Sequence, residues 1–176
     1  IQCGFRKDIT TGKLTPFHDR RALDLALQIT KHANPDRIVF LGDNLDLPEW
    51  SNKFVVSPEF LFTTQPSIVE LGWIYSQFRL QNLDAGIDAI AGNHELRLNN
   101  AIVNNLKASY GLRPADSHEG LPSLSIEKLL CLDKLNINYH GDYPQGVVWL
   151  NENFMRHHGE VVRSGSGKTV STVVND

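Results

Sequence analysis

Residues 37–46 read RIVFLGDNLD, an apolar run that stops at a glycine and leads directly into carboxylate and amide side chains. The β-branched and aromatic residues of Arg37–Leu41 predict a buried strand. A second apolar run, Ile87–Ala91, stops in the same way and is followed by Gly-Asn-His-Glu at positions 92–95. Because the loops at the carboxyl ends of strands form the ligand crevice of an open α/β sheet, we expect both polar clusters to lie in one site.

The side chains of these loops, together with one later histidine, suit divalent cations. Asp43, Asn93 and His158 offer a carboxylate, an amide and an imidazole, a mixture that transition metals accept. Two metals roughly 3.5–4 Å apart that share a carboxylate would hold phosphoryl oxygens and generate a hydroxide near neutral pH. His94 suits the remaining step, because an imidazole titrates near pH ~6.5 and can protonate a leaving oxygen. These residue types indicate hydrolysis of a phosphoester.

Three motifs in this order resemble the calcineurin-like metallophosphoesterase superfamily, whose blocks run D-x-[HQ], GDxxD, GNH[DE], HG and GHxH. The matching blocks are Gly42–Asp46, Gly92–Glu95 and His158–Gly159, and the resemblance covers nearly all of the chain. GNHE after a strand is the sharper motif, because Gly-Asp turns after strands are common. Only one of the adjacent His157 and His158 can enter the site if they lie in a strand, and we expect it to be His158 because it directly precedes the glycine.

The resemblance implies a role for each residue of these blocks. Asp43 would bridge two metals, Asn93 and His158 would ligate the second metal, and His94 would be the acid that stabilises the transition state. Gln2 resembles the last position of a D-x-Q first block, whose aspartate would lie just before residue 1. The closing GHxH block is absent, and the C-terminal residues resemble the stretch that leads into it. We therefore expect a domain that is clipped at both ends.

The resemblance also implies the fold and the activity. The fold class would be α/β, with two mixed sheets flanked by helices in an α/β/β/α sandwich, and residues 1–176 would form a single domain. The activity would be hydrolysis of a phosphomonoester or phosphodiester in a small molecule or nucleotide, with two divalent metals drawn from Mn, Fe, Zn or Ni. The alternative is a catalytically silent member of this fold that serves as a binding scaffold, and the presence of His94 counts against it.

The branch of the superfamily is less defined. The D-x-Q form resembles dinucleoside polyphosphate hydrolases, whereas GDNLDLPEWS and the overall layout resemble the uncharacterised metallophosphoesterases of bacteriophages. Serine/threonine protein phosphatases are disfavoured, because Leu47–Asn52 replaces the Asp-Arg-Gly continuation that is typical of them.

Several residues near the motifs leave two interpretations open. Arg97 extends the second motif to GNHExR, a form in which the arginine lies close to the site; it would either contact phosphate or belong to a solvated or ion-paired helix face. Asp46 is expected to support the ligands or cap a turn, and Glu95 to favour the first turn of the next helix through its charge. Asp19 is expected to cap a helix. His18 would either line the cleft or be an ordinary histidine.

One tempting motif and several histidines are set aside. Residues 165–169, GSGKT, resemble the end of a phosphate-binding loop, but the full spacing requires glycine at the position of Val162. A P-loop phosphotransferase is therefore disfavoured. His32, His118 and His140 lack partners at ligand spacing, so each is expected to be a surface or hydrogen-bonded histidine.

Composition limits the class of protein. The 176 residues, of which 41% are hydrophobic and 21% charged, suffice for one compact domain and argue against disorder. The net charge of -3 does not support a broad basic surface for nucleic acid, although a nucleotide could still be cut by metals. Two separate cysteines, no membrane-spanning apolar run and no signal-peptide pattern favour a reduced, cytoplasmic setting without a membrane partner.

Periodicity predicts the remaining elements. Helices are expected at 20–32, 67–81, 95–110, 126–133 and from residue 166 onward. Strands 147–150 and 153–157 should form a hairpin around a polar turn. Strands that alternate with helices and then end in a hairpin fit an α/β architecture with the helices outside.

Overall fold

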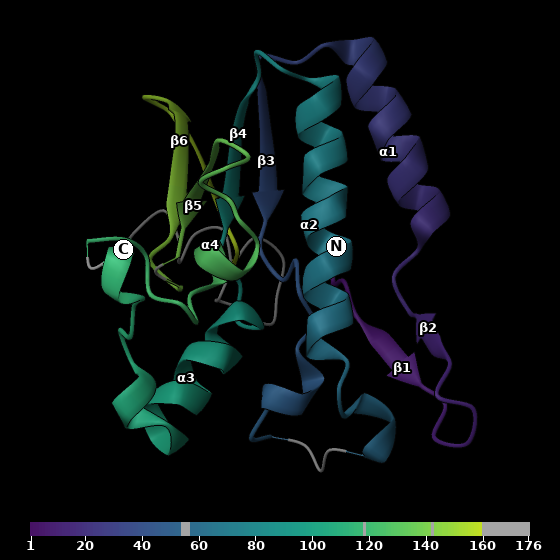
Figure 1. Ribbon diagram of the computed structural model, residues 1–176. Helices are drawn as coiled ribbons and strands as arrows, with labels where there is room; N and C mark the ends of the chain where they lie inside the picture. Colours follow the sequence, from purple (N-terminus) through teal and green to yellow (C-terminus); the bar gives the residue numbers. More distant parts are fainter. Residues whose placement is uncertain (54–56, 118, 142, 160–176) are drawn as a thin grey trace, which may run out of the picture.

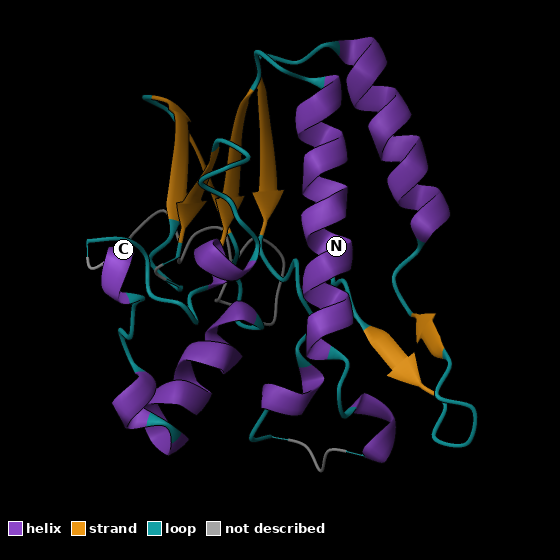
Figure 2. Cartoon of the chain, in the orientation of Figure 1, coloured by secondary structure: helices purple, strands orange, loops and turns teal. Residues whose placement is uncertain are grey.

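The computed structural model of the chain describes residues 1–53, 57–117, 119–141 and 143–159 (Figure 1). Its centre is a parallel sheet of three strands, in the order β3 (Arg37–Leu41), β4 (Gly86–Ile90) and β5 (Ile137–His140). Two antiparallel hairpins accompany it: β1 (Phe5–Lys7) with β2 (Leu14–Pro16), and β6 (Val147–Asn151) with β7 (Phe154–His157). Figure 2 shows the long helices gathered on one side of the central strands. The predicted α/β class is confirmed.

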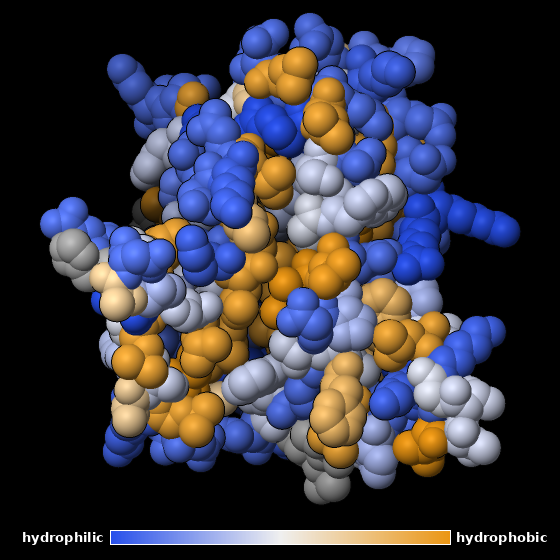
Figure 3. Space-filling model, viewed as in Figure 1, coloured by the Kyte–Doolittle hydropathy of each residue, from blue (hydrophilic) through white to orange (hydrophobic). Residues whose placement is uncertain are grey.

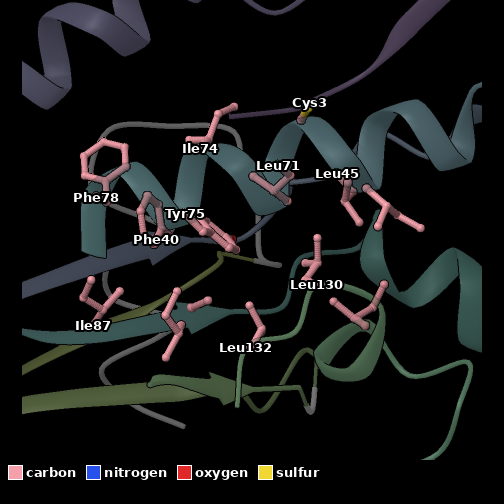
Figure 4. Packing of buried hydrophobic residues seen from close by; sticks show 14 of the residues in the cluster. Cys3, Phe40, Leu45, Leu71, Ile74, Tyr75, Phe78, Ile87, Leu130 and Leu132 are labelled. Carbon is pink, nitrogen blue, oxygen red and sulfur yellow. The ribbon is translucent and has the colours of Figure 1, made fainter. Parts of the chain in front are cut away.

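Helix α2 (Thr64–Gln81) covers one face of the sheet and supplies much of the core. Phe40 of β3 packs against two of its rings, with centroids 4.6 Å from Tyr75 and 5.2 Å from Phe78. Figure 4 shows the rings of Phe40 and Tyr75 between the helix and the strands, with Ile87 of β4 below them, while Ile74 lies on the other side of the helix. The aromatic residues Tyr75 and Phe78 of this helix therefore belong to the core.

Helix α1 (Arg20–Ala33) packs against the outer side of α2 (Figure 1). It begins after Asp19, whose carboxylate accepts hydrogen bonds from the backbone N–H groups of Arg21 and Ala22 at 2.9 and 3.1 Å. The predicted helix cap is confirmed. The helix ends at Asn34, which adopts the left-handed conformation common at helix C-termini.

The opposite face of the sheet carries a buried polar network at Asp88, and β4 contacts strand β6 of the β6–β7 hairpin. Asp88 of β4 is buried, and its carboxylate accepts hydrogen bonds from Arg37 Nε at 2.7 Å and His140 Nε2 at 2.9 Å. Arg37 also donates to the carbonyl oxygen of Trp149 in β6 at 3.2 Å. Burial by itself would raise the pKa of Asp88, but the hydrogen bonds from Arg37 and His140 outweigh it and hold the pKa below its usual value. The ionised Asp88 therefore links the three strands and, through Arg37, the hairpin.

The N-terminal segment runs beside the loop that follows β3. Cys3 and Leu45 form an isolated parallel bridge, and the N–H groups of Gln2 and Cys3 donate to the carbonyl oxygens of Asp43 and Asn44, each at 2.7 Å. Burial raises the pKa of the Cys3 thiol to about 12. Because metals and electrophiles react with the thiolate, this cysteine contributes packing rather than a ligand or nucleophile.

Two helices are shorter than predicted, and two strand pairings were missed. Helix α3 (Glu95–Asn105) ends before the predicted residue 110, because Leu106 leaves the helical conformation at φ -131°. Helix α4 (Ile126–Leu129) ends before the predicted residue 133, because Cys131 adopts a positive φ of 53°. Strand β5 and the β1–β2 hairpin escaped prediction because their strands have only three or four residues, too few for a periodic signal. The short 3-10 helices are η1 (Pro48–Trp50), η2 (Pro58–Phe60), η3 (Lys107–Ser109) and η4 (Ala115–Ser117).

Of the remaining predictions about the fold, those for three strands are confirmed and the others stay predictions. Strand β3 has the predicted bounds, and β6 and β7 form the predicted hairpin. Within the described residues each sheet is purely parallel or purely antiparallel, so the sandwich of two mixed sheets stays a prediction, as does the single domain. The helix expected from residue 166 onward lies outside the described residues. Among the helices that are described, none combines the length and apolar character needed to cross a bilayer.

The Asp88 network predicts a pH-dependent stability. Asp88→Asn should lower the free energy of unfolding at pH 7 by about 2–3 kcal/mol, the scale of hydrogen bonds to a charged group. The folded-state pKa is lowered, so this stabilisation is complete above the unfolded pKa of about 3.9 and is lost as pH falls through the folded value. Urea unfolding at pH 7, 5 and 3 should show the difference shrinking at the lowest pH. Asp133→Asn, at an exposed site, is the control, and an equal effect of the two substitutions would contradict this account.

Candidate metal centre

Three of the four side chains predicted to bind metal lie together at the carboxyl edge of the sheet. Asp43 follows β3, Asn93 follows β4 and His158 follows β7. Nε2 of His158 is 3.3 Å from Oδ1 of Asp43 and 3.3 Å from Oδ1 of Asn93. Side chains from three separate parts of the sequence thus meet at one point, as their positions after strands predict.

The contact of Nδ1 of His158 determines whether Nε2 of the same ring acts as a hydrogen-bond donor or acceptor. Nδ1 lies 2.6 Å from the carbonyl oxygen of Leu41, and because a carbonyl only accepts, Nδ1 carries a proton. In the neutral ring Nε2 is then an acceptor, yet it faces the carboxylate oxygen of Asp43 and the amide oxygen of Asn93. Lone pairs that converge in this way repel unless a cation lies between them or the ring takes a second proton. Histidines that bind a metal through one ring nitrogen commonly donate the N–H of the second nitrogen to a backbone carbonyl, as Nδ1 of His158 does.

Two glycines allow this close approach. Gly42 has a φ of +82°, and a Cβ there would collide with the His158 ring, 2.6 Å from its Cγ. A Cβ on Gly92 would collide with the backbone and carboxylate of Asp43, 3.0 Å from its Cγ. Both motif glycines therefore leave space that the ligand side chains occupy, in addition to the backbone freedom that Gly42 needs.

The carboxylate of Glu95 joins the two loops of the site. Oε1 accepts hydrogen bonds from the N–H groups of Asn44 and Leu45 at 2.7 and 2.9 Å, and Oε2 accepts from those of Asp43 and Gly92 at 3.1 and 2.8 Å. Glu95 is 4% exposed, so these four donors replace the water that a carboxylate otherwise needs. The sequence predicted a charge effect in the first helical turn and missed this cross-link, because three of the donors belong to the loop after another strand.

His94 lies beside the same aspartate and close to a second one, Asp46. Its Nδ1 is 3.0 Å from Oδ1 of Asp46, within ion-pair distance though outside hydrogen-bonding alignment, and its Nε2 is 3.7 Å from Oδ2 of Asp43. The backbone N–H of His94 donates to Oδ1 of Asp43 at 3.0 Å. Asp46 thus contacts His94, as a supporting residue would.

Arg97 and Gln2 lie close to the site without touching the three converging side chains in the described contacts. Arg97 Nη1 donates to the carbonyl oxygen of Asp46 at 2.5 Å, so the guanidinium holds the loop after β3. Gln2 is exposed and reaches the site through its backbone, whose N–H donates to the carbonyl oxygen of Asp43. A phosphate contact for Arg97 and a metal contact for Gln2 stay predictions.

His18 is a buried structural histidine. It is 8% exposed, and its Nε2 lies 3.1 Å from Oε1 of Glu70, which also accepts a hydrogen bond from Arg20 Nε at 2.7 Å. Burial would raise the pKa of Glu70, but Arg20 and His18 outweigh it and lower the pKa. The carboxylate stays ionised, and His18 ties the N-terminal segment to α2.

The remaining histidines follow the sequence expectation where they are described. His140 bonds to Asp88, and Nδ1 of His32 lies 3.0 Å from the carbonyl oxygen of Gln28. His118 and the segment 162–169, which holds the partial phosphate-loop motif, lie outside the described residues.

One neighbour of the site carries no signal in the sequence. The ring of Tyr143 meets the His158 ring edge-on, with centroids 5.8 Å apart. It lies in the loop between β5 and β6, away from every motif, so neither spacing nor residue type pointed to it.

The donor chemistry of the site suits a cation. Within residues 1–53, 57–117, 119–141 and 143–159, no three His, Cys, Asp or Glu side chains form a metal-binding group. The converging set includes an amide, which lies outside that definition, and it combines a carboxylate oxygen, an amide oxygen and an imidazole nitrogen. The contact of His158 Nδ1 with the carbonyl oxygen of Leu41 and the approach of Nε2 to the oxygens of Asp43 and Asn93 suit a bound divalent ion.

Comparisons of the chain with protein-family models, curated proteins and solved structures found no match.

Substitution of Glu95 tests the cross-link between the loops. Glu95→Gln leaves one accepting oxygen and turns an NH₂ group toward N–H donors, so the free energy of unfolding should fall by about 3 kcal/mol, since each buried donor that loses its acceptor costs about 1–3 kcal/mol. Chemical denaturation measures the loss. Glu152→Gln, at the exposed turn of the β6–β7 hairpin, is the matched control. Equal stability of the two variants would refute the cross-link.

The space at Gly42 can be tested against a second glycine with the same backbone strain. Gly111 has a φ of +76°, but a Cβ there would meet only Arg113, at 3.9 Å. Gly111→Ala should cost about 1–2 kcal/mol for the left-handed conformation. Gly42→Ala should cost more and should also shift the imidazole resonances of His158 in NMR spectra. Unchanged His158 resonances would show that the close approach does not position the ring.

Proposed function

We propose that the protein is a metal-dependent hydrolase that cleaves phosphomonoester or phosphodiester bonds at a dinuclear metal centre of the metallophosphoesterase type. The resemblance of GDNLD, GNHE and the later His-Gly to that superfamily supports the proposal. The α/β fold, with these motifs at the carboxyl ends of strands, is the arrangement in which such sites occur.

One observation carries the proposal. Nε2 of His158 faces Oδ1 of Asp43 and Oδ1 of Asn93 at 3.3 Å each, while its Nδ1 proton is committed to the carbonyl oxygen of Leu41. Three acceptors directed at one point are the surroundings that a cation stabilises. Asp43, Asn93 and His158 would hold one ion, and Asp43 would share its carboxylate with a second.

Besides holding the metal ions, residues of the chain would donate a proton and support the proton donor. Bound divalent ions of this kind supply Lewis-acid stabilisation of phosphoryl oxygens and a hydroxide nucleophile near neutral pH. His94, held between Asp43 and Asp46, would donate a proton from Nε2 to the leaving oxygen. Arg97 would act indirectly, because its hydrogen bond to Asp46 keeps the partner of His94 in place.

Two substitutions separate metal binding from chemistry in the full-length protein. Asp43→Asn should sharply lower the bound Mn²⁺ found by metal analysis, because an amide cannot supply the negative charge of the shared carboxylate. His94→Ala should leave metal content nearly intact while kcat falls roughly 10²–10⁴-fold, the contribution of a general acid. The loss should shrink for aryl phosphates with good leaving groups, which need less protonation.

The exposed His32→Ala on α1 is the control for both measurements. Loss of metal in His94→Ala, or equal slowing of activated and unactivated substrates, would remove the acid role. Wild-type protein that binds Mn²⁺ and phosphoester but does not turn over would instead indicate the binding scaffold.

A further inference from the structure

The hydrogen bond of His158 to Leu41 does not by itself fix the plane of the imidazole. Nδ1 contacts the carbonyl oxygen of Leu41 at 2.6 Å, but one hydrogen bond holds one atom and lets the ring turn about it. The torsion that sets the plane of a histidine ring has broad energy minima, so packing decides the plane. A turn of the ring would move Nε2 away from the oxygens of Asp43 and Asn93, which it faces at 3.3 Å each.

Gly42 and Tyr143 both pack against this ring. A Cβ on Gly42 would lie 2.6 Å from Cγ of His158, so the backbone there is in close contact with the imidazole. The ring of Tyr143 meets the imidazole edge-on, with centroids 5.8 Å apart and an angle of 63° between the planes, an arrangement that aromatic pairs prefer. The His158 side chain is 19% exposed, so most of its surface is covered. Tyr143 supplies a contact that can be removed without changing the backbone beside the ring.

The β6–β7 hairpin explains why these two rings meet. Its register pairs Val147 with His157 at the open end, so the chain enters β6 and leaves β7 at the same place. The chain that leads into β6 is held against the sheet, because a Cβ on Gly146 would lie 2.8 Å from the carbonyl oxygen of His140 at the end of β5. Backbone contacts that involve no metal thus place Tyr143 beside the imidazole.

We infer that Tyr143 is a positioning residue of the candidate metal centre, whose ring keeps the imidazole of His158 turned toward Asp43 and Asn93. The inference rests on the proposed function for the bound ion, whereas the orientation of the ring is a property of the protein alone. The effect of Tyr143 passes through His158, so it concerns how tightly an ion is held rather than the chemical step.

Substitution of the ring tests this role through metal affinity. Tyr143→Leu keeps apolar volume but removes the ring, and it should weaken Mn²⁺ binding by the full-length protein about tenfold, the lower end of the range for groups that orient metal-ligating histidines. Tyr143→Phe keeps the ring and should retain the wild-type dissociation constant in calorimetry. Tyr110→Leu is the matched control, because Tyr110 is 65% exposed and follows η3. Hydrolysis by Tyr143→Leu should recover at saturating Mn²⁺.

A metal-free measurement separates positioning from a general loss of stability. Nitrogen NMR shifts of the neutral His158 ring in the wild type should report a proton on Nδ1, the nitrogen that contacts Leu41. Nuclear Overhauser cross-peaks should join the ring protons of Tyr143 and His158. Tyr143→Leu should shift the two ring nitrogens toward a mixture of tautomers, because the ring can then turn away from the carbonyl. Tyr143→Phe and Tyr110→Leu should keep the wild-type shifts.

Either an unchanged tautomer or an unchanged Mn²⁺ affinity in Tyr143→Leu would overturn the inference. Equal losses in Tyr143→Phe and Tyr143→Leu would also overturn it, because the hydroxyl rather than the ring would then be responsible. Absence of the cross-peaks in the wild type would do the same without relying on the folding of any variant. Wild-type protein that binds no Mn²⁺ would refute the proposed function, and the tautomer comparison would still decide the role of Tyr143.

Discussion

The Glu95 carboxylate accepts hydrogen bonds from four backbone N–H groups, and the rest of the site depends on this contact. Three of the donors lie in the loop after β3 and the fourth in the loop after β4, so one buried charge sets the distance between the two motifs. The loop after β3 contains Gly42 and Asp43, both at positive φ, a backbone that persists only where its surroundings hold it. The position of Asp43 beside Asn93 and His158 follows from that support.

The same contact occupies backbone N–H groups that could otherwise bind an anion. Successive N–H groups in such a loop often form a concave anion site, but here the protein's own carboxylate occupies them. Arg97 is likewise directed to a carbonyl oxygen.

The two faces of the sheet make different kinds of contact. The face toward α2 is apolar and packs aromatic rings on β3 (Figure 4). The opposite face holds the ionised Asp88 with Arg37, which binds the hairpin backbone at Trp149. This polar contact helps hold the β6–β7 hairpin, whose last strand directly precedes His158. The network around Asp88 at the middle of the sheet therefore contributes to the position of the His158 side chain at its edge.

Hydrophobic side chains at the surface gather between α2 and the region of α3 and α4, away from the mostly hydrophilic upper end of the molecule in Figure 3. A cavity of about 540 Å³ lies in that region, lined by residues of α3, α4 and the connection between them. It touches Glu95, whose oxygens already accept hydrogen bonds from backbone N–H groups.

Local sequence determined the elements with strong patterns and the residue types of the site. The apolar run at Arg37–Leu41, the cap at Asp19 and the polar residues after each strand follow from short-range periodicity and backbone preference. The structure then brings Asp43 and Asn93 together because the parallel strands β3 and β4 present their carboxyl ends at one edge, and the β6–β7 hairpin adds His158. Tertiary structure alone decided the rest. The tautomer of His158 depends on the carbonyl of Leu41, the role of Glu95 on N–H groups of another loop, and the close packing of Phe17 and Asp46 on the space at Gly4. These contacts join residues distant along the chain, and a local pattern carries no information about which of them meet.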